Sequence, residues 1–305
     1  MAFHQKHPVL TGFFILAGIF LLFGGGISLL LSSMISPRPN GSALFSKKSG
    51  VGVVDLKGLI ATSEETLAVL ADFRKNAAIK AIVLRIDSPG GAVGAAQEIY
   101  EEVKRTNKVK PVVASMGSLA ASGGYYAALG TEKIFANPGT LTGSVGVIVK
   151  FANLEELFHK IGYKNEVIKS GDLKDIGSPS RPITEAERAL LQDLIDNIHS
   201  QFVRDVAEHR GLPEDEVRKL ADGRIFSGEQ AKAAGLIDEL GNFTDAALLA
   251  AKLGGLDAEE LPELIYPAGK NSFLDMISTE SSLNFLNLLF TKKHPILSYE
   301  WSGNL

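Results

Sequence analysis

The sequence contains no cysteine, which excludes disulfides, thiolate metal sites and cysteine nucleophiles. The six histidines are scattered without the spacing of metal ligands, so we expect no metal site, and no other cofactor is called for. Basic residues are not in excess, because the formal net charge is −4, and no basic stripe indicates nucleic-acid binding. The 305 residues, 45% hydrophobic and 22% charged, fit a globular protein with one large or two small domains.

Charged residues are also absent from residues 9–31, a run long enough at ~1.5 Å per residue to cross the ~30 Å hydrocarbon layer. A cleaved signal peptide is the alternative, since glycines 24–26 could end its apolar region. Apolar residues resume at 27–31, however, and no clear cleavage site follows. We expect a retained transmembrane helix, with residues 1–36 forming a short N-terminal lead and the anchor, and residues 37–49 forming a Pro/Gly/Ser linker.

The folded domain is expected at residues 50–265, where apolar strands alternate with amphipathic helices. We expect strands at 51–56, 81–86, 111–115 and 133–136, a loop entering a strand at 141–149, an extended stretch at 166–169, and helices at 64–75, 92–105 and 154–161. This alternation predicts an α/β fold with largely buried strands. A helical C-terminal part follows, with helices expected from Thr184 to about residue 209 and at 214–220, 228–234 and 244–253. Residues 266–305 form an amphipathic tail whose apolar run at 283–290 is too short to span a bilayer.

The stretch Met116-Gly-Ser-Leu-Ala-Ala-Ser122-Gly-Gly-Tyr-Tyr126 joins an expected strand to a helix. Ser122 at that junction would lie beside unpaired backbone N–H groups, among residues too small to block another chain. An acyl-transfer nucleophile needs an exposed hydroxyl, oxyanion donors and open access, and this segment would provide them. A small-residue packing contact under a helix is the alternative interpretation.

A second glycine-rich turn, Asp87-Ser-Pro-Gly-Gly91, could supply one oxyanion N–H from Gly91, and Gly123 could supply another. The histidines of the folded part, His159, His199 and His209, lie in charge-rich helical stretches where solvated side chains are expected. A base for Ser122 would then be a lysine kept neutral by burial. Lys174 lies among small residues in a loop, and Lys169 competes with it.

Several motifs together resemble the bacterial signal peptide peptidase A family, in its short single-copy form. They lie between about residues 50 and 260 and comprise Asp87-Ser-Pro-Gly-Gly91, residues 116–126, Leu141-Thr-Gly-Ser-Val-Gly146, residues 168–181, 221–231 and 235–241. The resemblance implies a Clp protease/crotonase-like fold of repeated ββα units. It also implies that Ser122 is the nucleophile, Lys174 the general base, Gly91 and Gly123 the oxyanion donors, and Ser144 a serine that hydrogen-bonds the base.

The same resemblance implies a membrane-anchored serine endopeptidase that degrades signal peptides after their release from preproteins, without a cofactor. Double-length relatives take the lysine and the serine from different halves, so a single-copy chain is expected to share its dyad between neighbouring protomers of a ring. The peptidase domain is expected on the outer, periplasmic side of the bacterial cytoplasmic membrane. The charge count alone predicts the opposite orientation, because Lys6 precedes the apolar run whereas Arg38, Lys47 and Lys48 follow it.

Three other functions remain open from the sequence. A crotonase-like acyl-CoA enzyme would share the fold and the oxyanion hole, but it needs neither a serine–lysine pair nor an anchor. A non-catalytic scaffold could bind apolar peptides at the membrane. A related protease that cuts the tails of membrane proteins would use the same chemistry.

Overall fold

The computed structural model describes residues 49–267 and 298–300, which belong to one compact unit. The expected anchor, most of the linker and the apolar run at 283–290 lie outside these residues. None of the helices within the two described ranges has the length and apolarity that a bilayer crossing needs.

A mixed α/β fold is confirmed. The first half of the unit contains β1 (Gly50–Lys57), α3 (Glu64–Lys75), β2 (Ile79–Ser88), β3 (Gly90–Ala92), α4 (Val93–Asn107), β4 (Val112–Ala121), α5 (Gly123–Leu129), β5 (Lys133–Ala136) and β6 (Leu141–Gly143). Then follow α6 (Glu155–Lys160), the 3₁₀ turn η1 (Asp172–Asp175), α7 (Glu185–Arg210), α8 (Glu214–Leu220), β7 (Ile225–Ser227), α9 (Gly228–Ala233), β8 (Glu239–Leu240), α10 (Phe243–Leu253), β9 (Leu264–Ile265) and β10 (Ser298–Glu300).

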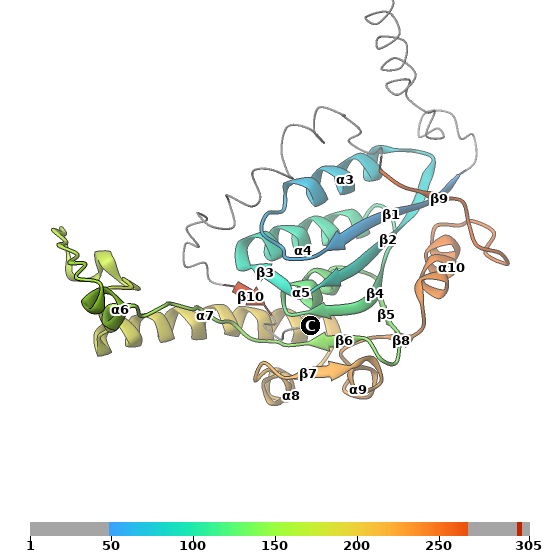
Figure 1. Cartoon of the computed structure of the whole chain (residues 1–305). Coiled ribbons are helices and arrows are strands. Elements are labelled where there is room, and N and C mark those ends of the chain that lie inside the picture. Colours follow the sequence, from blue (N-terminus) through green and yellow to red (C-terminus); the bar gives the residue numbers. More distant parts are fainter. Residues whose placement is uncertain (1–48, 268–297, 301–305) are drawn as a thin grey trace, which may run out of the picture. The chain divides into compact units, whose positions relative to one another are not determined.

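The central sheet of the described part runs in the order β7-β6-β4-β2-β1-β9, and β5 joins it beside β4 (Figure 1). Strands β1, β2, β4, β5 and β6 pair in parallel. Helices cover both faces, which explains why the central residues of these strands are mostly apolar. One edge of β4 is shared, because residues 113–116 pair with β5 and residues 119–121 pair with β6. The C-terminal end of β4 therefore meets β6.

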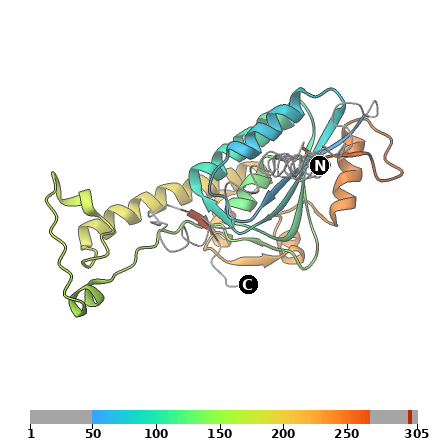
Figure 2. The same ribbon diagram turned by 45° about the horizontal axis from the view of Figure 1, so that its top comes forward.

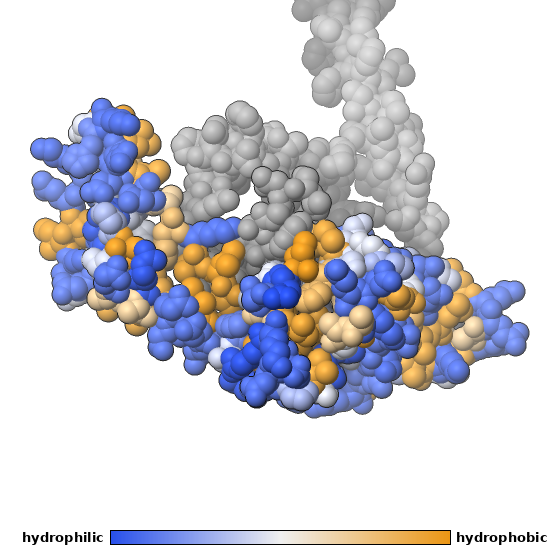
Figure 3. Space-filling view, turned by 90° about the horizontal axis from the view of Figure 1, so that it is seen from below, coloured by the Kyte–Doolittle hydropathy of each residue, from blue (hydrophilic) through white to orange (hydrophobic). Residues whose placement is uncertain are grey.

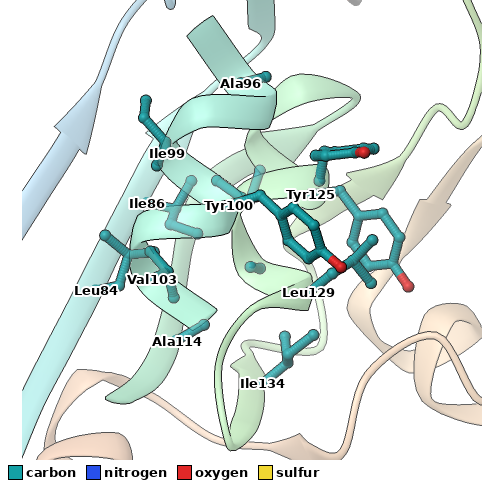
Figure 4. Packing of buried hydrophobic residues seen from close by; sticks show 14 of the residues in the cluster. Leu84, Ile86, Ala96, Ile99, Tyr100, Val103, Ala114, Tyr125, Leu129 and Ile134 are labelled. Carbon is teal, nitrogen blue, oxygen red and sulfur yellow. The ribbon is translucent and has the colours of Figure 1, made fainter. Parts of the chain in front are cut away.

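Alternate residues of β2 enter two separate cores. Ile82, Leu84 and Ile86 face α4, α5 and α7, and all three are fully buried. Ala81 and Val83 face the alanine-rich side of α10. Figure 4 shows how side chains of α4 and α5 interlock over the first of these faces. Every residue of α5 is buried there, so the helix that follows Ser122 is fixed by packing on several sides.

Helix α7 begins and ends where the sequence predicts. Thr184 accepts a hydrogen bond from the Glu187 amide, and the Glu187 carboxylate accepts one from the Thr184 amide, which completes a capping box. Gly211 ends the helix in the left-handed region at φ 63°. The buried residues of the C-terminal half, among them Phe202 and Val206, join the first core.

We call residues 149–195 the arm: they comprise the segment after β6 and the N-terminal half of α7. In Figures 1 and 2 the arm leads away from the sheet, with α6 at the end of α7 that lies farthest from α5. Figure 3 shows apolar surface among polar residues on the arm, at the left of the view. The exposed large apolar side chains of the arm are Leu154, Leu157, Ile161, Tyr163, Val167, Ile168, Leu173, Leu190 and Leu194. A cavity of about 520 Å³ lies between α7 and the preceding segment, beside Phe151 and Leu191.

Two expectations for this region need correction. A loop entering a strand was expected over 141–149, but the strand comes first, at Leu141–Gly143, and an irregular segment follows it. The chain turns away after Gly143, because Gly143 and Ser144 both adopt positive φ values. The histidines of α7 were expected to be solvated, but His199 and His209 are partly buried, and His209 Nε2 lies 2.5 Å from the Tyr100 hydroxyl. Burial and the nearby Lys104 lower the pKa of His209.

Candidate active site

Ser122 lies between the end of β4 and the start of α5, as the sequence predicts. Its backbone has φ 54° and ψ −115°, in the left-handed half of φ space that is costly for a residue with a side chain. Its amide donates to the Gly143 carbonyl at 2.8 Å, and its carbonyl accepts from the Tyr126 amide at 2.8 Å. The strained conformation is therefore held from both sides, as in the sharp strand-to-helix turns that carry nucleophiles.

The hydroxyl of Ser122 was expected to be exposed, but the residue is only 1% accessible. Strand β10 contacts both β3 and α5 near this position. The side chain makes no hydrogen bond with any described residue. Ser122 is thus a buried serine whose hydroxyl has no hydrogen-bond partner among the residues that the structure describes.

Gly91, in β3, presents its N–H on the edge of the strand that faces away from Ile60. The Gly90 carbonyl accepts from the Ile60 amide at 2.8 Å, and the Ala92 amide donates to the Ile60 carbonyl at 2.7 Å. Successive amides of a strand point to opposite sides, so the Gly91 N–H points to the other edge. A β-carbon on Gly91 would lie 2.1 Å from the Ile60 oxygen, which explains why this position carries glycine.

The structure brings Gly91 and Gly123 together. A β-carbon on Gly123 would lie 3.2 Å from the Gly91 nitrogen and 3.2 Å from the Gly90 α-carbon. The start of α5 therefore packs closely against β3, at a distance where a β-carbon would be tight. Two backbone N–H donors beside Ser122 can stabilise one developing oxyanion.

The outer edge of β3 is paired with β10 from the C-terminal end of the chain. The pairing is antiparallel, with Tyr299 opposite Gly91 and Glu300 opposite Gly90 (Figure 1). The Gly90 amide donates to the Ser88 hydroxyl at 3.1 Å, and the Ala92 amide already bonds Ile60. In an antiparallel ladder, hydrogen-bonded and non-bonded pairs alternate, so Gly91 and Tyr299 form the hydrogen-bonded pair. The chain's own strand β10 thus occupies the outer edge of β3.

Ser144 lies next to Gly143, the residue whose carbonyl fixes Ser122. It is 6% exposed, adopts φ 51°, and its amide donates to the Arg224 carbonyl at 2.8 Å. Within the described ranges, Ser122 and Ser144 are the residues other than glycine with positive φ. Backbone strain of this kind concentrates at functional sites. The two predicted serines therefore lie close together at the ends of the adjacent strands β4 and β6.

Lys174 lies in η1 on the arm, exposed to solvent, and it is not brought to Ser122 in its own chain. No hydrogen bond among the described residues joins it to Ser122 or Ser144, and it makes no ion pair there. The competing Lys169 is already engaged, because its Nζ donates to an Asp175 carboxylate oxygen at 2.7 Å and to the Asp172 carbonyl at 2.8 Å. Of the two lysines, Lys174 is the one that is available to another molecule.

Sequence reasoning missed the polar side chains that support the site. Ser88 is fully buried, and its hydroxyl donates to the Gly58 carbonyl at 2.6 Å while it accepts from Gly90, which fixes the turn into β3. Arg181 bridges Asp175 to Glu187. The Thr184-x-x-Glu187 capping pattern could have pointed to Glu187, but no local signal pairs it with Arg181.

The candidate site is thus a strained serine between a parallel strand and a buried helix of a mixed α/β fold, with Gly91 and Gly123 packed against each other next to it. The family profile of Clp protease matches residues 57–140. The profile of Peptidase family S49 matches residues 104–257, and the chain belongs to this family. The resemblance noted in the sequence is thereby confirmed.

Curated relatives agree with that membership. The chain is 49% identical over 181 residues to "Putative protease slr0021" of Synechocystis, covering 59% of this chain and 65% of that protein. It is 38% identical over 181 residues to "Putative signal peptide peptidase SppA" of Enterococcus faecium, covering 59% and 53%. It is 35% identical over 237 residues to "Protease 4" of Salmonella typhi, covering 74% and 38%. The chain spans less than two thirds of the length of each.

Proposed function

We propose that this protein is a serine endopeptidase with Ser122 as its nucleophile and the amides of Gly91 and Gly123 as oxyanion donors. The observation that carries the proposal is the strained, covered Ser122 beside a strand edge that already pairs with an extended chain. Antiparallel pairing on a strand edge is a common way to hold a peptide for cleavage, because it straightens the substrate and fixes its register. Membership of a peptidase family supports the same activity.

The general base in this proposal is Lys174 of a neighbouring protomer. Lys174 is exposed and unpaired among the described residues, and it lies on an arm with many exposed apolar side chains. Such a surface favours burial against a second copy of the chain. Contacts between unlike surfaces that repeat around an axis close into a ring. Enclosure between subunits removes water from the ammonium group and favours its neutral form.

The reaction then follows from these groups. Neutral Lys174 accepts the Ser122 proton while Oγ attacks the peptide carbonyl, and the two glycine amides bind the oxyanion. The lysine ammonium next protonates the leaving amine, which leaves an acyl-enzyme. Lys174 finally activates a water molecule that hydrolyses the ester. Ser144, beside Gly143, would hydrogen-bond the lysine and orient it.

The substrates we propose are apolar peptides, in particular signal peptides left in the membrane after their release. An anchor at residues 9–31 would hold the enzyme in the bacterial cytoplasmic membrane with the peptidase domain on its outer side. The small residues around Ser122 leave room for an extended backbone. The name of the Enterococcus faecium relative, a signal peptide peptidase, supports this substrate class.

Co-expression of two inactive variants tests the shared dyad. Ser122→Ala and Lys174→Ala should each lower peptide cleavage by roughly a thousandfold or more. In rings that contain equal amounts of both, about a quarter of the adjacent pairs combine an intact serine with an intact lysine, so about a quarter of the activity should return. No recovery in mixed rings of proven composition would contradict the shared dyad. Cleavage that survives Ser122→Ala would contradict the proposal that the protein is a serine endopeptidase with Ser122 as its nucleophile.

A further inference from the structure

The turn that carries Lys174 is tied down by an ion-pair cluster centred on Arg181. The guanidinium grips Asp175, the residue next to Lys174, with Nη2 2.8 Å from Oδ1 and Nε 3.1 Å from Oδ2. Lys169 Nζ lies 2.7 Å from the same Oδ1. Both carboxylate oxygens of Asp175 are therefore occupied by cations. These contacts hold the pKa of Asp175 well below its usual range, with Arg181 as the larger cause.

The other side of the guanidinium is bound to α7. Nη1 of Arg181 lies 2.9 Å from Oε2 of Glu187, and Nη2 contacts Oε1. Glu187 is 2% exposed and also accepts from the Thr184 amide at 2.8 Å within the capping box. Hydrogen bonds from Arg181 first, and then from Thr184, lower the pKa of Glu187 to about 2. Arg181 thus connects the Lys174 turn to the first turn of the long helix.

This arrangement matters for a lysine that must lose its proton. An unpaired carboxylate next to Lys174 would attract the ammonium and stabilise its charged form. The charged groups around the turn are Asp172 and Asp175 within it, Lys169 before it, Arg181 after it and Glu187 on α7. The turn contains two carboxylates. Asp175 is paired with both Lys169 and Arg181, whereas Asp172 makes no ion pair with a described residue.

We propose that Arg181 is a positioning residue for the general base: it fixes the Lys174 turn on α7 and keeps the Asp175 carboxylate from pairing with Lys174. The inference rests on the proposed function, because it takes Lys174 as the base. Its two parts have separate consequences. The first predicts the mobility of the turn, and the second predicts the pH at which the enzyme becomes active.

The pH dependence of kcat/KM tests the electrostatic part in the full-length, assembled protein. Arg181→Met leaves Lys169 as the one cation that still pairs with Asp175 and frees the Oδ2 side of this carboxylate, so the acid limb of the pH profile should move to higher pH by about one unit or more. Asp175→Asn added to Arg181→Met removes the released charge and should return the limb toward its original position. Arg181→Lys supplies a single point charge that does not bridge two carboxylates, so its limb should lie between those of the wild type and Arg181→Met. Arg188→Met serves as the control, because Arg188 is an exposed arginine of α7 without an ion pair among the described residues, and its limb should not move.

Hydrogen exchange tests the positioning part without any assay of activity. The amides of Lys174, Ile176 and Ser178 donate within the turn, to Gly171, Leu173 and Asp175 respectively. Their exchange should accelerate in Arg181→Met and stay unchanged in Arg188→Met. Because this readout needs no cleavage, it holds even if Ser122→Ala shows that the chain is not a serine protease.

Some outcomes would overturn the inference. An equal loss of kcat/KM at every pH in Arg181→Met, with the acid limb in place, would assign Arg181 a merely structural role. A shifted limb that Asp175→Asn fails to reverse would show that the released carboxylate is not the cause. Unchanged exchange of the three amides would remove the positioning role. If Arg181→Met does not assemble, Arg181→Lys is measured in the same way and decides by the same criteria.

Discussion

The strand β10 occupies the edge of β3 where the proposed substrate would pair, so weakening β10 should improve substrate binding. Tyr299→Pro is the most direct change, because proline has no N–H to donate to β3 and is poorly tolerated in a paired strand. The substitution acts on the backbone at the position opposite Gly91. The Gly91 amide would then be free to bind a peptide in trans.

The expected size of the effect follows from the ladder. A hydrogen-bonded antiparallel pair exchanges two N–H···O bonds, and each contributes a net free energy of about 0.5–1.5 kcal/mol. Loss of both would weaken the docking of the tail by about 1–3 kcal/mol. At about 1.4 kcal/mol per factor of ten, the apparent KM for a peptide should fall by about 5- to 140-fold.

Initial rates with an apolar fluorogenic peptide, measured on the full-length protein in detergent, would give KM and kcat separately. Tyr299→Phe keeps the backbone donor and is the matched control. The expected result is a lower KM in Tyr299→Pro, with kcat little changed and the control resembling the wild type. An unchanged KM in Tyr299→Pro would refute the idea that β10 competes with substrate for β3.

Three further predictions concern the site and the arm. Gly91→Ala should destabilise the protein by about 1–3 kcal/mol and abolish cleavage, because the alanine β-carbon would lie 2.1 Å from the Ile60 oxygen. Gly94→Ala is the control, because a β-carbon there has nothing within 4 Å. Its thermal unfolding should stay near that of the wild type. The free energy of unfolding of Ser122→Gly should exceed that of Ser122→Ala by about 1 kcal/mol, because glycine relieves the backbone strain. Thermal unfolding measures this difference, and an equal or higher melting temperature of the alanine variant would contradict it. The ionised Glu187 carboxylate stabilises the arm at pH values above about 4.5, its pKa in the unfolded chain. This stabilisation is lost as the pH falls toward its pKa of about 2 in the folded protein. Glu187→Gln should therefore accelerate hydrogen exchange at the start of α7 near neutral pH but not near pH 2.

Local signals predicted most of the helices. The threonine, the acid three positions later and Gly211 determine both ends of α7 through hydrogen bonds that span a few residues. Apolar runs such as 81–86 predicted strands because both faces of this sheet are covered. The glycine-rich turn and the serine segment were found for the same reason, since each is a short motif whose residues act together.

Other features depended on contacts between distant residues. The course of the chain after Gly143 is fixed by the bonds of Ser122 and Ser144 to residues elsewhere in the sequence. The burial of Ser122 and the pairing of Gly91 with Tyr299 bring together segments from opposite ends of the chain. The pattern of apolar residues along the sequence does not predict such a pairing, because the pairing depends on loop closure and on which strand edge remains unpaired.

The sequence by itself determined the main helices, the long strands of the sheet, the nucleophile and oxyanion candidates, and the family, since these depend on neighbouring residues or on ordered motifs. The tertiary structure alone decided that Gly91 and Gly123 lie together, that Ser122 and Ser144 flank Gly143, and that Arg181 holds Asp175. It also placed Lys174 on an arm away from the serine of its own chain. The physical reason is that packing of the sheet, and not local propensity, determines which distant backbones and charges meet.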